Sequence, residues 1–294
     1  MKLPLPQTSR QAVRVAAAFV TVLLIVLLGA LRGSEPARPA YHHYVAMGDS
    51  YTAAPFVPLT DIARGCLRSS NNYPNLVADA LHIEDLSDRS CSGARTKHLP
   101  GSQRTARGLK VPPQFAALDK ETDLVTVGIG ANNYSLYARV ATVCRRTTGI
   151  CPLYDERETL GHIVDQLRSA LVPTLEQIQQ RAPSARVLLI GYPKLLPARG
   201  NCARLPRMRP QDRNTLRSIN LRLRQEMHAS AEEADVEFVD FYGTSLGHDI
   251  CSRHPWVQGR IGSTKRGAAL HPLPAGQAAL ARQIEEALRE EPGS

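Results

Sequence analysis

Residues 44–53 read YVAMGDSYTA, and this stretch decides the fold. A short apolar run leads directly into Gly48-Asp49-Ser50, which is typical of a buried strand that ends in a tight turn before a helix. Runs of the same kind, short, apolar and often β-branched, recur along the chain and predict four more strands. They span residues 83–86, 123–129, 185–190 and 236–241.

Apolar residues at helical spacing separate these runs. The clearest patterns span residues 160–178 and 216–227, and a third follows Pro272. Pro173 is expected to kink the first of these helices. Strands that alternate with helices favour right-handed β-α-β crossovers, so we expect a three-layer α/β/α sandwich around a five-stranded parallel sheet. The functional crevice of such a sheet lies outside the carboxyl ends of its strands.

The chain begins with a segment typical of export. Residues 15–31 form a nearly unbroken apolar run behind a few basic residues, the layout of a signal peptide or an uncleaved membrane anchor. We expect residues 1–32 to be that segment, 33–40 a flexible linker and 41–292 one catalytic domain. The domain should therefore be secreted or held at the outer face of the cytoplasmic membrane.

The six cysteines all follow the apolar run, which fits an oxidising compartment and predicts three disulfides. No Cys-x-x-Cys or His-Glu-x-x-His motif occurs, so a metal site is not expected. The cysteines lie at positions 66, 91, 144, 151, 202 and 251.

The formal net charge of +9 is partly local, because residues 199–224 hold eight arginines against the single acid Asp212. Charge runs are usually solvated surface, and this is the simpler interpretation. The alternative is attraction to an anionic lipid surface through Arg204, Arg207 and Arg209. Nucleic acid is excluded as a partner, because an exported chain with only 5% aromatic residues has no base-stacking pattern.

Four residues that follow predicted strands could together perform acyl transfer. Ester hydrolysis needs a hydroxyl nucleophile, a base that takes its proton, and hydrogen-bond donors where the oxyanion develops. Ser50 is the candidate nucleophile and His271 the candidate base. The backbone N–H groups of Ser50 and Gly93 and the Asn132 amide are the candidate oxyanion donors. Each motif alone is more often structural, but their order and shared location favour a catalytic site.

In these residues the chain resembles the SGNH (GDSL-type) hydrolases, and most closely the actinobacterial secreted lipases and esterases. The resemblance implies a flavodoxin-like α/β/α fold and acyl-ester hydrolysis, including phospholipase A1 and short-chain esterase activities. It implies no cofactor, and we expect a monomer. The matching blocks are Gly48-Asp49-Ser50, the segment centred on Gly93, Gly130-Ala131-Asn132-Asn133, and His271-Pro272.

Two positions depart from the pattern of that family. Asn133 stands where the family usually has Asp, so we expect altered loop bonding rather than lost activity. Ala268 stands where the carboxylate that orients the catalytic histidine usually lies. Members of the resembled group can use a backbone carbonyl instead, so the Ala268 carbonyl is the expected orienting group. Asp249 is the rival acid.

The resemblance also predicts the disulfide pairing. A flavodoxin-like strand order of 2-1-3-4-5 places the first and second strands side by side, and likewise the fourth and fifth. Cysteines that follow neighbouring strands should then pair, leaving one small loop after the third strand. The predicted pairs are Cys66–Cys91, Cys144–Cys151 and Cys202–Cys251.

Rival functions remain open at this point. Gly243-Thr244-Ser245-Leu246-Gly247 fits a nucleophile elbow, but no helix pattern follows it, so Ser245 is the weaker candidate. The same four residues would also serve an acyltransferase or a deacetylase of cell-envelope glycan or lipid. A protein of another class, an inactive secreted binding module, is disfavoured because the whole constellation is present.

Overall fold

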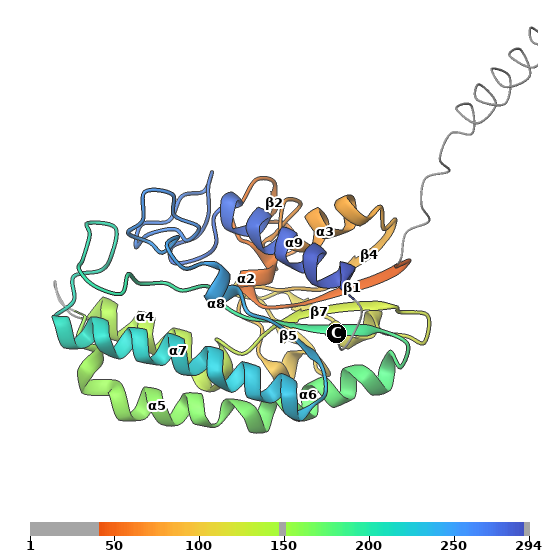
Figure 1. The fold of residues 1–294 in the computed structure, drawn as a ribbon, viewed down its shortest axis with the longest axis horizontal. Coiled ribbons are helices and arrows are strands. Elements are labelled where there is room, and N and C mark those ends of the chain that lie inside the picture. The colour runs from red at the N-terminus through yellow and green to blue at the C-terminus, as the bar shows by residue number, and fades with distance from the viewer. Residues whose placement is uncertain (1–40, 147–150, 291–294) are drawn as a thin grey trace, which may run out of the picture. The chain divides into compact units, whose positions relative to one another are not determined.

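A five-stranded parallel sheet forms the centre of the protein, in the order β4-β1-β7-β8-β9 (Figure 1). Counted along the chain among these five, this is 2-1-3-4-5, so the predicted flavodoxin-like order is confirmed. The strands are β1 (His43–Gly48), β4 (Asp85–Asp88), β7 (Leu124–Gly128), β8 (Arg186–Ile190) and β9 (Glu237–Val239).

The computed structural model describes residues 41–146 and 151–290. The predicted signal or anchor segment (1–32) and linker (33–40) lie outside the described residues. Among the helices that are described, none is long and apolar enough to cross a bilayer.

Helices cover both faces of the sheet. Figure 1 shows α3 (Tyr73–Leu81) and α9 (Pro274–Arg289) on one face, and α6 (Leu167–Arg181) and α7 (Pro210–Glu233) on the other. The remaining helices are α2 (Ser50–Ala53), α4 (Leu136–Arg146), α5 (Arg157–Asp165) and α8 (Phe241–Thr244), with 3₁₀ turns at Thr96–His98, Gln114–Ala117, Asn133–Ser135 and Leu153–Glu156. Two small ribbons pair β2 (Thr60–Asp61) with β3 (Arg68–Ser69) and β5 (Gln103–Arg104) with β6 (Lys110–Val111).

Alternation along β1 divides the core into two layers. Tyr44 and Ala46 pack with α3 and α9, whereas Val45 and Met47 pack with α6 and α7. Helices on both faces leave no polar side for the central strands, so every residue of β7 is buried. The predicted stripe on α9 is confirmed, and its three members are all buried: Leu280, Ile284 and Leu288.

Two strands begin or end at residues other than those predicted. The second strand starts at Asp85, because Ile83 is already buried in the core shared with α3. The fifth ends at Val239, because the Asp240 carboxylate accepts a hydrogen bond from the Gly243 amide and starts α8. Both shifts come from tertiary contacts and a cap, which apolar runs alone do not show.

The predicted helix over 160–178 is two helices. The chain breaks at Gln166, between α5 and α6, and α6 runs on through Pro173. Near this proline the Thr174 hydroxyl donates to the Ala170 carbonyl at 2.7 Å, whereas the carbonyl that loses its backbone donor at Pro173 is that of Ser169, four residues earlier. The helix is not interrupted at Pro173, and the kink expected there stays a prediction.

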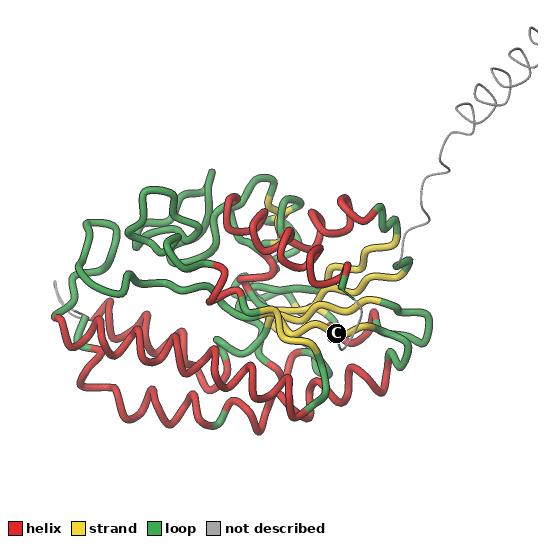
Figure 2. The backbone as a smooth tube through the Cα atoms, viewed as in Figure 1, coloured by secondary structure: helices red, strands yellow, loops and turns green. Residues whose placement is uncertain are grey.

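Disulfides join the loops that follow neighbouring strands. Cys66 bonds with Cys91, and Cys202 bonds with Cys251, which confirms two of the predicted pairs. The third predicted pair includes Cys144, whose side chain lies outside the described residues. Figure 2 shows the largest group of loops beyond one end of the sheet.

Candidate active site

Ser50 follows a tight turn that requires glycine at position 48. β1 ends at Gly48, and the Asp49 amide donates a hydrogen bond to the Gly128 carbonyl at 2.9 Å. A Cβ on Gly48 would lie 2.5 Å from that carbonyl oxygen, so only glycine allows this close approach. The Asp49 carboxylate accepts from the Tyr51 amide at 2.9 Å and so caps α2, whose first residue is Ser50.

Ser50 and His271 form a hydrogen-bonded pair. His271 Nε2 lies 2.8 Å from Ser50 Oγ, and His271 Nδ1 lies 2.8 Å from the Ala269 carbonyl oxygen. A carbonyl can only accept, so Nδ1 carries the ring proton and Nε2 can accept the proton of the serine hydroxyl. The pair therefore has the tautomer that a general base requires.

The orienting carbonyl lies one residue beyond the predicted one. The Ala268 carbonyl accepts instead from the His271 backbone amide at 3.2 Å, and the chain turns here with Leu270 at a φ of 62°. This turn presents the Ala269 carbonyl to the ring, so the prediction of Ala268 is corrected to Ala269. The rival Asp249 accepts from a backbone amide in its own loop, and within the described residues no hydrogen bond joins it to His271.

Burial sets the charge of two ionisable groups at this edge. It lowers the pKa of His271, and the hydrogen bond to Ala269 opposes that shift more weakly. The imidazole is therefore neutral near pH 7. Burial also raises the pKa of Asp49 to about 7, against the hydrogen bonds that its carboxylate accepts from Tyr192 and Tyr51.

Two loops bring Gly93 and Asn132 beside the Ser50 turn. The Cys91 amide donates at 3.0 Å to the carbonyl that ends β1, which fixes the loop that carries Gly93. Asn132 Nδ2 donates to the Ala94 carbonyl at 3.1 Å, which ties the loop after β7 to the same place. In residues 41–146 and 151–290, the backbone N–H groups of Ser50 and Gly93 make no hydrogen bond, so both donors are available.

Asn133 bonds its loop to the turn at Thr96. Its Oδ1 accepts from the Thr96 amide at 3.0 Å, and its Nδ2 donates to the Thr96 hydroxyl at 2.9 Å. The amide of Asn133 donates the second of these bonds to the Thr96 hydroxyl. An ionised aspartate, the usual family residue here, has no hydrogen to donate, so it could bond that hydroxyl only as an acceptor. Asn133 thus links the two loops that carry Gly93 and Asn132.

Sequence reasoning missed two tyrosines at this site. Tyr192 donates to the Asp49 carboxylate at 2.6 Å and accepts from the Ala131 amide at 3.0 Å. The Tyr51 ring lies 5.1 Å from the His271 ring, and its hydroxyl donates at 2.5 Å to the carbonyl that precedes His271. Tyr192 follows β8 closely, so the rule that functional groups collect at strand ends could have found it.

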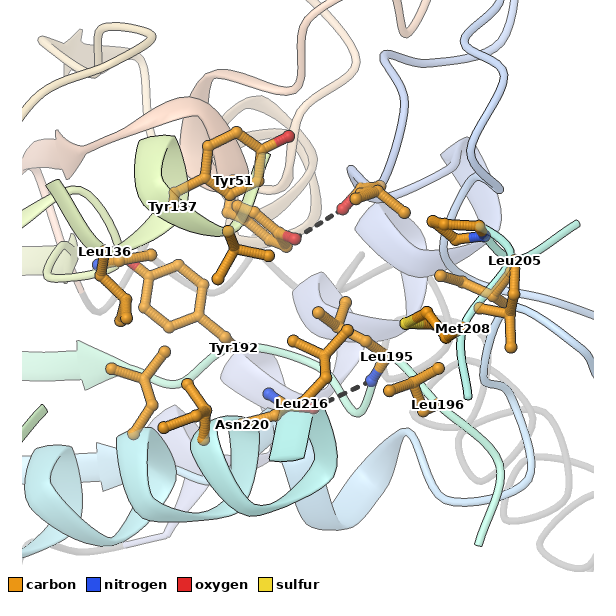
Figure 3. A pocket seen from close by; sticks show the side chains of 17 residues that line it. Tyr51, Leu136, Tyr137, Tyr192, Leu195, Leu196, Leu205, Met208, Leu216 and Asn220 are labelled. Atoms are coloured by element: carbon orange, nitrogen blue, oxygen red, sulfur yellow. Dashed lines mark hydrogen bonds between the residues drawn. The ribbon is translucent and has the colours of Figure 1, made fainter. Parts of the chain in front are cut away.

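An apolar cavity of about 90 Å³ lies beside the serine–histidine pair (Figure 3). Tyr51 and Leu270, the chain neighbours of Ser50 and His271, both line it. Figure 3 shows Tyr51 on one side and Leu216 of α7 on the other. The walls between them are mostly buried aliphatic side chains, including Leu136, Leu195, Leu196, Leu205, Met208 and Ile250.

The rival serine is bound into the scaffold. Ser245 is fully buried; its hydroxyl accepts from the Lys194 amide at 2.8 Å and donates to the Tyr242 carbonyl at 3.1 Å. It is not paired with a histidine. In the described ranges there is also no group of three His, Cys, Asp or Glu side chains that could hold a metal ion.

The model of the GDSL-like lipase/acylhydrolase family matches residues 46–279, which include the Ser50 turn, both donor loops and His271. The chain belongs to this family. It is 35% identical to Lipase 2 of Streptomyces coelicolor over 256 residues, 81% of this chain and 84% of that protein.

Solved structures agree with the sequence relatives. Phospholipase A1 from Streptomyces albidoflavus and an extracellular lipase from Streptomyces rimosus each superpose with a TM-score of 0.72 at 26% identity. Each comparison covers 84% of this chain and 99% of the other. The fold is therefore that of these SGNH hydrolases, and the protein is an ester hydrolase that acts on acyl esters.

Proposed function

We propose that Ser50 and His271 hydrolyse the ester through an acyl-serine intermediate, with the 2.8 Å contact between Ser50 Oγ and His271 Nε2 as the observation that carries the proposal. Ser50 Oγ attacks the ester carbonyl while its proton passes to His271 Nε2. The histidinium then gives this proton to the departing alcohol. Water attacks the acyl-serine and loses a proton to His271, which returns it to Ser50 Oγ as the acid leaves.

Three donors would stabilise the oxyanion in both steps. They are the free backbone N–H groups of Ser50 and Gly93 and the side-chain amide of Asn132. Both N–H groups of the Asn132 amide have partners, the Ala94 carbonyl at 3.1 Å and the Asp49 carboxylate at 3.4 Å, so the longer contact with Asp49 would be exchanged for the oxyanion. A neutral carbonyl at Ala269 stabilises imidazolium less than a carboxylate does, so these donors should carry more of the catalysis.

The substrate class follows from the cavity beside Ser50. Its lining is almost entirely apolar and begins at the chain neighbours of both catalytic residues, so an acyl chain attached to Ser50 could enter it directly. Burial of each methylene contributes about 0.8 kcal/mol. We infer a lipid-type acyl ester as the substrate, in keeping with the relatives named lipase and phospholipase A1.

The N-terminal segment and the disulfides support export. Residues 1–32 are proposed to be a signal peptide or membrane anchor and residues 33–40 a linker, with the catalytic domain from residue 41. Disulfides such as Cys66–Cys91 persist in oxidising compartments, and one relative is named an extracellular lipase. Mass spectrometry of the mature protein would distinguish a cleaved signal from a retained anchor.

The catalytic assignment is tested with Ser50→Ala, His271→Ala and Asp249→Asn. The first two should lower kcat for p-nitrophenyl butyrate by more than about 10³-fold, the scale of losing a nucleophile or its base. Asp249→Asn, the matched control at the rival acid, should lower kcat by less than about tenfold, because the Ala269 carbonyl orients the ring.

A fluorophosphonate probe provides the second measurement. It should label the wild type and Asp249→Asn but not Ser50→Ala. Circular dichroism must first confirm folding, since Asp249 caps the loop that contains Cys251. A well-folded Asp249→Asn enzyme that lost about 10⁴ in kcat would defeat the dyad and make Asp249 the third catalytic residue.

A further inference from the structure

A second hollow, of about 220 Å³, is lined by residues that directly precede two lining residues of the acyl cavity in the chain. Leu205 and Pro206 line the acyl cavity, whereas Ala203 and Arg204, just before them, line this hollow. Its lining also includes Arg260 and Arg266. Three arginines therefore line a single hollow that shares a wall with the acyl cavity.

The charges of these arginines are not compensated within the hollow. Arg204 donates to the Ser252 carbonyl at 2.6 Å, and Arg260 Nε donates to the Ala203 carbonyl at 3.3 Å. Neutral carbonyls fix the direction of a guanidinium but leave its charge in place. None of the residues that line the hollow is acidic.

Some arginines of the basic stretch are instead neutralised by acids. Arg209 forms two bonds with Asp212, at 2.7 and 2.9 Å, and Arg224 forms two with Asp240, at 2.8 and 2.7 Å. Arg204 and Arg209 were both predicted to attract an anionic surface. Arg204 lines the hollow, whereas the charge of Arg209 is neutralised by Asp212.

The hollow is close to the catalytic histidine along the chain and in space. Gln258, which lines it, donates its amide to the His271 carbonyl at 2.8 Å, and Val257 bridges to Pro272. A lipid whose acyl chain enters the apolar cavity at Ser50 would have its polar part outside that cavity, in reach of this loop.

We propose that Arg204, Arg260 and Arg266 bind the phosphate of an anionic glycerophospholipid whose acyl ester is hydrolysed at Ser50. The assignment rests on the proposed function. Guanidinium groups bind phosphate oxygens in paired hydrogen bonds, and three of them without an acid favour a headgroup that carries no cation. Phosphatidylglycerol should therefore be preferred over phosphatidylcholine.

Binding is tested in a Ser50→Ala background, so that no substrate is consumed. In co-sedimentation, the affinity for phosphatidylglycerol vesicles should fall about tenfold in Arg260→Gln/Arg266→Gln. Each basic residue near an anionic surface contributes appreciably to the free energy of binding. The matched control is Lys120→Gln, an exposed cation shortly before β7 at the opposite end of the sheet, which should bind within about twofold of the parent. Equal weakening in both, or in neither, would overturn the proposal.

Rates of hydrolysis show whether the double variant is still correctly folded and whether the arginines determine the lipid preference. The double variant should keep p-nitrophenyl butyrate activity and lose the preference for phosphatidylglycerol over phosphatidylcholine vesicles. Loss of butyrate activity would make these arginines part of the scaffold and reject the assignment. Binding of soluble glycerol 3-phosphate as tight as that of the vesicles would reject a lipid source. Failure of the catalytic proposal would appear separately, as hydrolysis that survives Ser50→Ala.

Discussion

The surroundings of His271 determine the pH range in which this enzyme works. Burial lowers the pKa of the imidazole, and the one strong partner that opposes the shift is a neutral carbonyl. Only the neutral ring can accept the Ser50 proton, so activity is lost as pH falls through that lowered pKa. A carboxylate partner would hold the pKa higher, because it stabilises the charged form.

We therefore expect the acid limb of kcat/KM for p-nitrophenyl butyrate to have its midpoint below pH 6.5, the ordinary histidine value. Rates measured between pH 4.5 and 8 in constant ionic strength would establish it. Because the Asp49 carboxyl has a pKa of about 7, the profile is repeated in Asp49→Asn, and a midpoint above 6.5 that persists there would mean that an acid approaches the ring and would contradict the carbonyl assignment. The neutral ester is chosen so that substrate charge does not enter the profile.

Residue identities at the site were predictable where a short motif carries them. Ser50, Gly93, Asn132 and His271 stand in the expected loops, and the structure brings these loops together. The carbonyl that orients the ring was displaced from Ala268 to the next residue, because a backbone turn uses the first carbonyl for its own amide. Such a turn depends on one positive φ, which alanine and leucine do not signal.

At the scale of elements, the apolar runs and the period-3.6 patterns predicted the strands and the long helices, and the family resemblance implied the sheet order that the structure has. The residues at which helices and strands begin and end were harder to predict. The break at Gln166 has no proline or glycine to mark it, and the cap that starts α8 lies inside an apolar run. Element boundaries depend on side-chain bonds and on neighbours distant in sequence, whereas the patterns report only which faces are buried.

Helix α7 offers a test of the acyl cavity at this scale. Leu216 lines the cavity on the side opposite Tyr51, whereas Leu221 on the same helix is 38% exposed and lies outside it. Leu216→Trp should fill that side of the cavity and lower kcat/KM for p-nitrophenyl octanoate by about tenfold, the effect of excluding one or two buried methylenes. Acetate hydrolysis should change little.

Leu221→Trp is the matched control and should leave the ratio of octanoate to acetate hydrolysis unchanged. A Leu216→Trp enzyme that kept the wild-type ratio would place the acyl chain elsewhere. Thermal unfolding of both variants separates this effect from a general loss of stability, since overpacking alone costs about 1–3 kcal/mol.

Across the whole molecule, the acyl cavity depends on segments that no local pattern relates. Its walls come from α4, α7, the stretch after β8 and the loop after β9. The Cys202–Cys251 disulfide joins the last two, next to Leu205 and Ile250. Cys66–Cys91 instead anchors the loop that carries Gly93. The pairing was predictable from strand order, but this division of roles emerges only from the assembled fold.

The two disulfides should therefore fail in different ways. Cys202→Ser/Cys251→Ser opens a loop of sequence separation 49 and should lower the free energy of unfolding by about 4 kcal/mol in the chain-entropy model. Because this link holds the cavity wall, the ratio of octanoate to acetate hydrolysis should fall as well.

Cys66→Ser/Cys91→Ser, with a sequence separation of 25, should lower the free energy of unfolding by about 3.5 kcal/mol. Its effect on rate should be the same for both esters, because the proposed oxyanion donor Gly93 would serve every substrate alike. Urea unfolding and the two ester rates, measured where both variants stay folded, would decide. An unchanged ratio in the first variant, or a fallen one in the second, would show that the disulfides act on stability alone.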